Sequence, residues 1–210
     1  MTYTDNTSVE GIIKQSVKDA KQHNQKMRRL WVRKMLNYYG GNGTNQYIQD
    51  YFNSSAFREI PCYNANFTRR FINKMSRIYT VGTSRNVNSQ YDALVIKKDA
   101  RMKHVERMTR LIGTVATQII YKEVNGMPYF DYRPIYYFDV HLSDPFTPTA
   151  IMYPLLMQPD DISYIEKCEW VYWDESIYAR YDENGNIMEE YEHGYGVLPF
   201  VFTHREEQID

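Results

Sequence analysis

The spacing of apolar residues changes near residue 113, and no other feature of the sequence constrains the fold as much. Before Gly113, apolar residues recur every three or four positions, which is the period of an amphipathic helix. After Gly113 they alternate with polar residues or form short runs rich in Tyr, Val, Ile and Phe, a pattern typical of strands. We therefore predict an α+β fold, in which a helical region over residues 1–113 precedes a mostly antiparallel β meander over residues 114–210.

Local signals place the helices. One helix is expected after Ser8, a good N-cap residue, and another ends where Gly40 and Gly41 supply a C-terminal cap. Asn64 is expected to cap a further helix, and the last helix ends at Ile112. The apolar stripes are Val9, Ile12, Ile13 and Val17 in the first helix, Phe67, Phe71, Met75 and Ile78 in the third, and Met102, Val105, Met108 and Ile112 in the last.

Turn residues divide the second half into strands. Asn125-Gly126 between two strand-like runs predicts a β-hairpin, because both positions of its turn need a positive φ. The remaining strands are expected over residues 135–140, 150–156, 170–173, 176–181, 187–191 and 198–202, with a turn at 183–186.

The charge is distributed unevenly between the two halves. Residues 1–110 hold 20 Lys and Arg against 8 Asp and Glu, a balance of +12, whereas residues 111–210 hold 5 against 18, a balance of −13. Opposite fields favour contact with an acidic partner, or contact between the halves of neighbouring subunits. Two solvated surfaces without a partner are the alternative.

Cysteine content and hydropathy indicate the cellular compartment in which the protein is made. Cys62 and Cys168 are the only cysteines, too few for a disulfide framework or a zinc pattern, which favours a reducing compartment. Residues 1–8 lack the order of a signal peptide, and no apolar run approaches the roughly 18–20 residues that cross a bilayer. We expect a protein made in the cytoplasm, without a membrane partner.

The order of these features resembles the wing region of tailed-bacteriophage portal proteins, the head-to-tail connector subunits. The resemblance covers about residues 60–205 and depends on order and spacing, since no single motif in it is specific. It rests on Asn64 with Phe67-Thr68-Arg69-Arg70-Phe71-Ile72, Gly113-Thr114-Val115-Ala116, the hairpin at 119–130, Arg133-Pro134-Ile135, the strand at 148–153, Tyr181-Asp182-Glu183-Asn184-Gly185-Asn186, and His193-Gly194-Tyr195-Gly196-Val197-Leu198-Pro199-Phe200-Val201.

The resemblance implies a structural role without catalysis or a cofactor. By it, copies of the chain form a cyclic ring, a dodecamer, at the capsid portal vertex of the virion. The ring conducts double-stranded DNA during packaging and ejection and joins head to tail. The implied partners are the terminase large subunit, the major capsid and scaffolding proteins, and tail or adaptor proteins. Portal subunits continue into stem, clip and crown, whereas this chain ends at Asp210. We therefore expect it to be the amino-terminal portion, and no DNA-contacting residue can be assigned.

One constellation offers a catalytic alternative. Asp139, His141 and Asp144 form a tight Asp-x-His-x-x-Asp group near a turn, and carboxylates with imidazole are ligands for a divalent metal. A metal held there would activate water in a hydrolase or nuclease. A strand end that leads into an Asp-Pro turn explains the same residues without a metal, and no second carboxylate cluster completes a site. Another head-completion or adaptor protein is the remaining alternative.

No other catalytic pattern is present. The sequence has no Gly-x-Ser-x-Gly elbow and no phosphate-binding glycine loop. Two groups of basic residues suit phosphate binding, or else form solvated helix faces and salt bridges to an acidic neighbour. They are Arg69, Arg70, Lys74, Arg77 and Arg85 in the first group, and Lys97, Lys98, Arg101, Lys103, Arg107 and Arg110 in the second. The 20 tyrosines suit both strands and protein interfaces.

Overall fold

The computed structural model describes residues 9–41, 66–79, 86, 88–95, 98–144, 147–155 and 168–205. Its helices are α1 (Val9–Ala20), α2 (His23–Gly40), α5 (Phe67–Met75), α6 (Ser89–Ala93) and α7 (Lys98–Ile112). Its strands are β1 (Thr114–Val124), β2 (Met127–Ile135), β3 (Asp139–Asp144), β4 (Thr147–Leu155), β5 (Glu169–Trp173), β6 (Ile177–Tyr181), β7 (Ile187–Glu192) and β8 (Phe200–His204). Helices precede strands along the chain, which confirms the predicted α+β fold.

The chain forms two compact units that are not divided at residue 113. The first unit consists of Met1–Arg33 and Ile135–Phe200, and the second of Lys34–Pro134 and Val201–Asp210. Residue 113 marks the change from helix to strand, but each compact unit combines helices with strands. The boundary in the amino-terminal half falls inside α2.

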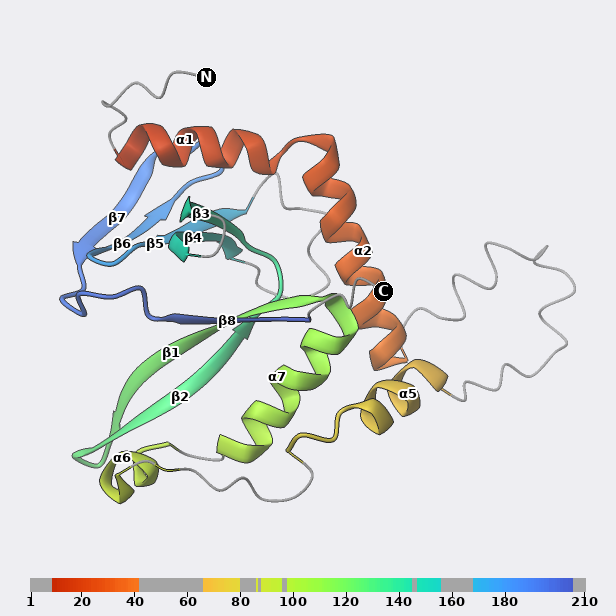
Figure 1. The fold of residues 1–210 in the computed structure, drawn as a ribbon. Coiled ribbons are helices and arrows are strands. Elements are labelled where there is room, and N and C mark those ends of the chain that lie inside the picture. Colours follow the sequence, from red (N-terminus) through yellow and green to blue (C-terminus); the bar gives the residue numbers. More distant parts are fainter. Residues whose placement is uncertain are drawn as a thin grey trace, which may run out of the picture. The chain divides into compact units, whose positions relative to one another are not determined.

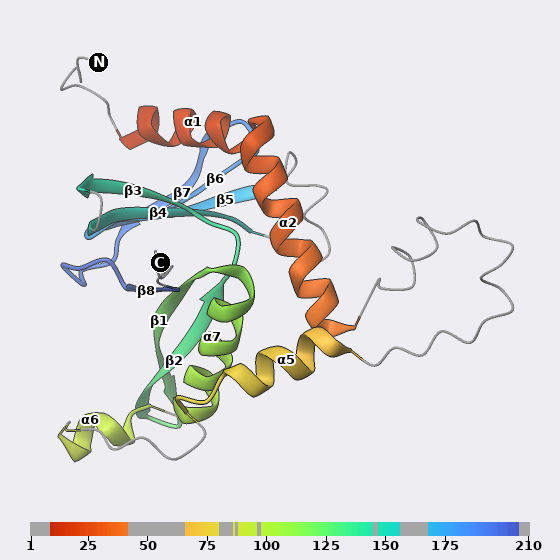
Figure 2. The ribbon, with the colours of Figure 1, turned by 45° about the vertical axis from the view of Figure 1, so that its right-hand side comes forward.

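The first unit contains the predicted meander. Strands β3, β4, β5, β6 and β7 form one sheet in sequence order, and every neighbouring pair is antiparallel. Helix α1 lies across this sheet (Figures 1 and 2) and buries Ile13 and Val17, as the apolar stripe predicts. Trp170 and Tyr181, opposite each other on β5 and β6, are both fully buried. The core of this unit is therefore built from aromatic as well as aliphatic side chains.

Several tyrosines of this unit take part in ring packing. The rings of Trp173 and Tyr178 lie 4.8 Å apart in an edge-to-face arrangement, and those of Tyr178 and Tyr191 lie 4.7 Å apart. Phe200 packs edge-on against Trp173 at 6.1 Å. Such geometries add to the free energy of area burial, so these tyrosines have a structural role.

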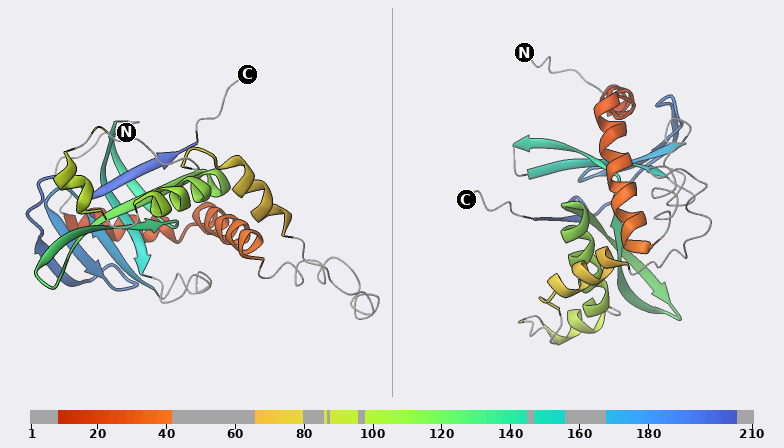
Figure 3. Two further views of the ribbon diagram at one scale, coloured as in Figure 1. Left: turned by 90° about the horizontal axis from the view of Figure 1, so that it is seen from below. Right: turned by 90° about the vertical axis from the view of Figure 1, so that its right-hand side faces the viewer.

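The second unit is a three-stranded sheet with α7 against it. The strand order is β2-β1-β8, and α7 packs on β1 (Figure 3). Val105, Met108 and Ile112 are buried, which confirms the predicted stripe of this helix. The hairpin turn is also confirmed, because Asn125 and Gly126 have φ angles of 53° and 75°.

Two strands differ from the sequence-based expectation. The third strand is expected over residues 135–140, but Ile135 belongs to β2 and β3 begins at Asp139. The last strand does not extend the meander and pairs with β1. The chain after β8 is held there because Arg205 donates its backbone N–H to the carbonyl of Gly113 at 2.9 Å.

Candidate subunit interface

Helix α5 exposes the side that its sequence marks as apolar. Phe67, Phe71, Met75 and Ile78 are 76%, 63%, 45% and 63% exposed. Residues four apart lie above one another on a helix, so Phe67, Phe71 and Met75 form one stripe along α5, and Ile78 lies just after the helix. An apolar stripe normally faces the core, and its exposure here marks α5 as a surface for association.

The opposite, polar side of α5 is attached to the end of α2. Asn66 is the N-cap: its side chain accepts a hydrogen bond from the backbone N–H of Arg69 and donates one to the carbonyl of Tyr39. Tyr39 donates its hydroxyl to Oδ1 of Asn73 at 3.0 Å, and the Arg69 guanidinium lies 5.9 Å from the ring of Tyr39. These contacts and the burial of Ile72 orient the helix. The predicted cap Asn64 lies outside the described residues.

Basic side chains border the exposed stripe. Arg70 and Lys74 are exposed and lie one helical turn apart beside Phe67 and Phe71, and Arg77, also exposed, follows the end of the helix. They belong to the first group of basic residues identified from the sequence, of which Arg85 lies outside the described residues. The exposed surface of α5, defined here as Phe67, Arg70, Phe71, Lys74 and Met75, therefore combines apolar area with positive charge.

Strand β7 has the opposite character. It is the last strand of the five-stranded sheet, and all six of its residues are exposed. It carries three acids, Glu189, Glu190 and Glu192, together with Ile187, Met188 and Tyr191, which are 46%, 50% and 48% exposed. Glu189 forms an ion pair with Arg180 at 3.6 Å. An edge strand offers unpaired backbone groups to another chain, and acidic side chains limit which partners can approach.

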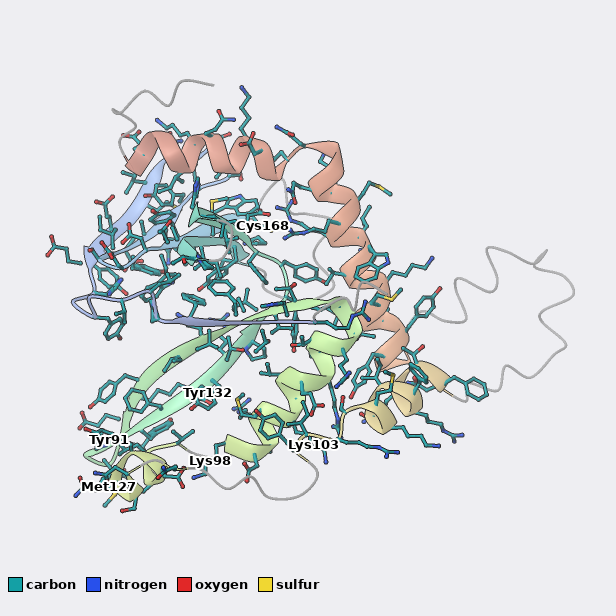
Figure 4. The ribbon with its side chains drawn as sticks, in the orientation of Figure 1. Tyr91, Lys98, Lys103, Met127, Tyr132 and Cys168 are labelled. Atoms are coloured by element: carbon teal, nitrogen blue, oxygen red, sulfur yellow. The ribbon has the colours of Figure 1, made fainter. Side chains whose placement is uncertain are left out.

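The second basic group is partly neutralised within its own unit. Lys98 forms an ion pair with Asp92, Arg101 with Asp131 at 3.2 Å, and Arg110 with Glu106 at 3.6 Å. A hydrogen bond from Lys122 to Asp131 at 2.9 Å lowers the pKa of that carboxyl. Lys98 and Lys103 of α7 are labelled in Figure 4. Intrachain pairing favours the solvated-face interpretation, and Lys97 lies outside the described residues.

The residues predicted as metal ligands are Asp139, His141 and Asp144, and the first of them is engaged in ion pairs. Asp139 binds Arg29 through Oδ2 at 2.9 Å and lies 3.4 Å from Arg28 through Oδ1. His141 is two residues further along β3, and the side chain of Asp144 is not described. Among the described residues, no group of three His, Cys, Asp or Glu side chains is arranged to hold a metal ion. The carboxylate of Asp139 therefore has a structural role in this unit.

Of the two cysteines, only Cys168 belongs to the described residues. Cys168 is half-buried and forms no disulfide within the described residues, whereas Cys62 lies outside them. None of the described helices combines the length and hydropathy that crossing a lipid bilayer requires. Comparison with known proteins finds neither a matching family model nor a similar curated sequence.

Proposed function

We propose that the chain is a structural subunit of a phage portal ring, which conducts double-stranded DNA and joins head to tail at the capsid vertex. The sequence resemblance supports this proposal, and the described chain contains a β-hairpin followed by an antiparallel meander. The observation that carries it is the presence, on one chain, of two exposed surfaces of complementary character. These are the apolar, basic surface of α5 and the apolar, acidic strand β7.

Complementary but different surfaces favour head-to-tail association. When the α5 surface of one copy meets β7 of the next, the contact is heterologous, and repeated contacts close into a ring or extend into a filament. The apolar residues supply burial energy, while Arg70 and Lys74 against Glu190 and Glu192 supply orientation and register. In such a ring no residue need perform chemistry.

Charge reversal tests the pairing of the two surfaces. The natural full-length product is first imaged by negative-stain electron microscopy, where closed rings with a central channel are expected. Arg70→Glu/Lys74→Glu is expected to abolish rings, and so is Glu190→Lys/Glu192→Lys. Combining all four substitutions is expected to restore rings, because the complementarity is then inverted rather than lost.

A matched control separates charge from position. Lys18→Glu/Arg133→Glu makes the same change in net charge as Arg70→Glu/Lys74→Glu, but at two exposed residues outside both surfaces, and rings are expected to persist. Monodisperse monomers of the unaltered protein at high concentration would overturn the proposed function. Rings that survive both reversals would leave the ring in place but refute this interface.

A further inference from the structure

A pocket of about 370 Å³ lies in the second unit. It is lined by one side of α7, by Ile78 and Tyr79 after α5, and by the end of β8 with Arg205. All of these residues belong to one compact unit. The volume falls within the range of pockets that bind small molecules.

A buried carboxylate lines this pocket with one oxygen unsatisfied. The Glu106 side chain is 7% exposed, and its Oε1 accepts a hydrogen bond from the backbone N–H of Ile78 at 3.5 Å. Its Oε2 is buried without a hydrogen-bond partner among the described residues. A buried acceptor that has lost water and gained no donor is costly. A ligand with an N–H group directed at Oε2 would recover that cost.

A buried donor lies beside this acceptor. Nε of Arg110 is 3.6 Å from Oε1 of Glu106, close enough for an ion pair but too long for a hydrogen bond. This nitrogen is also buried and lacks a hydrogen-bond partner within the described part of the chain. Arg205 adds a second guanidinium to the lining. The pocket therefore presents a carboxylate that needs a donor and, next to it, cationic groups that suit an anion.

The rest of the lining is mostly apolar, and its polar residues are Thr109, Thr203 and His204. Met102, Val105 and Ile78 contribute aliphatic surface, and Tyr79 contributes a ring. The hydroxyls of Thr109 and Thr203 lie 2.9 Å apart, and each is also within hydrogen-bonding distance of a backbone carbonyl, so both are satisfied without a ligand. The matching ligand has an ammonium group, a carboxylate close to it, and an aliphatic body.

We propose that this pocket binds a free aliphatic α-amino acid. The ammonium group pairs with the carboxylate of Glu106, the carboxylate of the ligand accepts from Arg110 and Arg205, and the aliphatic side chain lies against Met102 and Val105. A simple organic cation fits less well because Arg110 and Arg205 repel it. A simple carboxylate fits less well because it leaves Oε2 of Glu106 unsatisfied. This site is independent of the proposed ring.

Calorimetric titration of the full chain with three probes tests the assignment. L-Leucine is expected to bind and to raise the melting temperature. 3-Methylbutylamine lacks the carboxylate and 4-methylpentanoate lacks the ammonium group, and each is expected to bind at least about tenfold more weakly. Either probe binding as tightly as leucine would overturn the zwitterion assignment. Absence of leucine binding near its solubility limit would overturn the site.

Variants connect binding to the pocket. Glu106→Gln removes the charge with little change in size and is expected to weaken leucine binding about tenfold or more. Arg110→Gln is expected to do the same, and it serves if Glu106→Gln fails to fold. Glu123→Gln, an exposed acid on β1, is the matched control and should leave affinity unchanged. Wild-type affinity in both folded pocket variants would refute the proposal.

Discussion

Tyr39 donates its hydroxyl hydrogen to Oδ1 of Asn73 at 3.0 Å and so joins the end of α2 to the polar side of α5. Asn66 strengthens the same attachment by donating to the carbonyl of Tyr39 at 3.0 Å. Because the polar side is held inward, the apolar stripe that begins at Phe67 points to solvent. These hydrogen bonds, together with the burial of Ile72, thus decide which side of the helix is available for association.

The attachment of α5 can be measured by a double-mutant cycle. Tyr39→Phe and Asn73→Ala are each expected to lower the free energy of unfolding by about 1 kcal/mol, because each removes the same part-buried hydrogen bond. The double variant should lose less than the sum, since the residues share one interaction. Tyr91→Phe, at an exposed tyrosine, is the control and should have little effect. Strictly additive losses would show that the bond contributes nothing.

The pair between Arg29 and Asp139 should dominate the stability of the first unit. The Arg29 side chain is 2% exposed, lies 5.5 Å from the ring of Trp170, and has a pKa lowered by burial. Asp139→Ala leaves this guanidinium without its carboxylate, and we expect a loss of about 3–5 kcal/mol in urea unfolding.

An exposed ion pair provides the comparison for this prediction. Glu189→Ala breaks the ion pair with Arg180. The side chains of Arg180 and Glu189 are 36% and 47% exposed, so the variant should lose less than about 1 kcal/mol of unfolding free energy. Equal losses in the two variants would contradict a special role for Arg29. A structural role also predicts that divalent metal does not change the melting temperature of the unaltered protein.

Buried tyrosines should make the first unit sensitive to alkali. Burial raises the pKa of Tyr181 to about 12, and burial together with the adjacent Asp174 carboxylate raises that of Tyr172 further. In the unfolded chain both groups ionise near pH 10. The folded state therefore holds these protons more tightly, so stability is intact below pH 10 and falls as the pH rises towards and through 12.

The melting temperature, measured between about pH 8 and pH 12, checks this linkage, because that range spans the tyrosine pKa of the unfolded chain. Tyr181→Phe is expected to flatten the alkaline decline, because the substituted ring has no proton to lose. Tyr121→Phe, at a half-exposed tyrosine of β1, should leave the decline unchanged. An identical alkaline profile in Tyr181→Phe would exclude this tyrosine as the cause.

The hairpin between β1 and β2 should depend on Gly126. Its φ is 75°, and a Cβ added there would meet nothing within 4 Å, so a substitution is penalised by backbone conformation alone. Gly126→Ala is expected to destabilise the second unit by about 1–2 kcal/mol. Amide hydrogen exchange of β1 and β2 measures the effect locally. Asn125→Gly should be tolerated, because glycine also accepts the positive φ at the preceding position; unchanged exchange in Gly126→Ala would contradict the argument.

Local sequence signals were sufficient for much of the fold. The change of periodicity at Gly113 determined where helices give way to strands, and Asn125-Gly126 determined the hairpin through its φ requirement. Val105, Met108 and Ile112 identified the buried side of α7. These features depend on interactions between neighbours in the chain, so their cause can be read from adjacent residues.

The candidate sites depended on partners that are distant in sequence. The amphipathic pattern of α5 shows that one side of the helix is apolar and the other polar, but the contacts with Tyr39 decide which side is covered. Nothing in the sequence of α7 distinguishes Glu106 and Arg110 from other helix residues. They line a pocket because the fold brings Ile78 and Arg205 beside them. Strand β7, which carries these exposed acids, is an edge strand because no further strand of the described chain pairs with it.

The sequence by itself therefore determined the type and order of the elements, the hairpin and the division of charge. Only the tertiary structure decided the pairing of β8 with β1, the exposure of α5, and the attachment of Arg29 to Asp139 across 110 residues. The physical reason is that periodicity encodes local geometry, whereas burial depends on which distant segments come together. That choice is made by the free energy of packing the whole chain, in which each local preference contributes only about 1 kcal/mol or less.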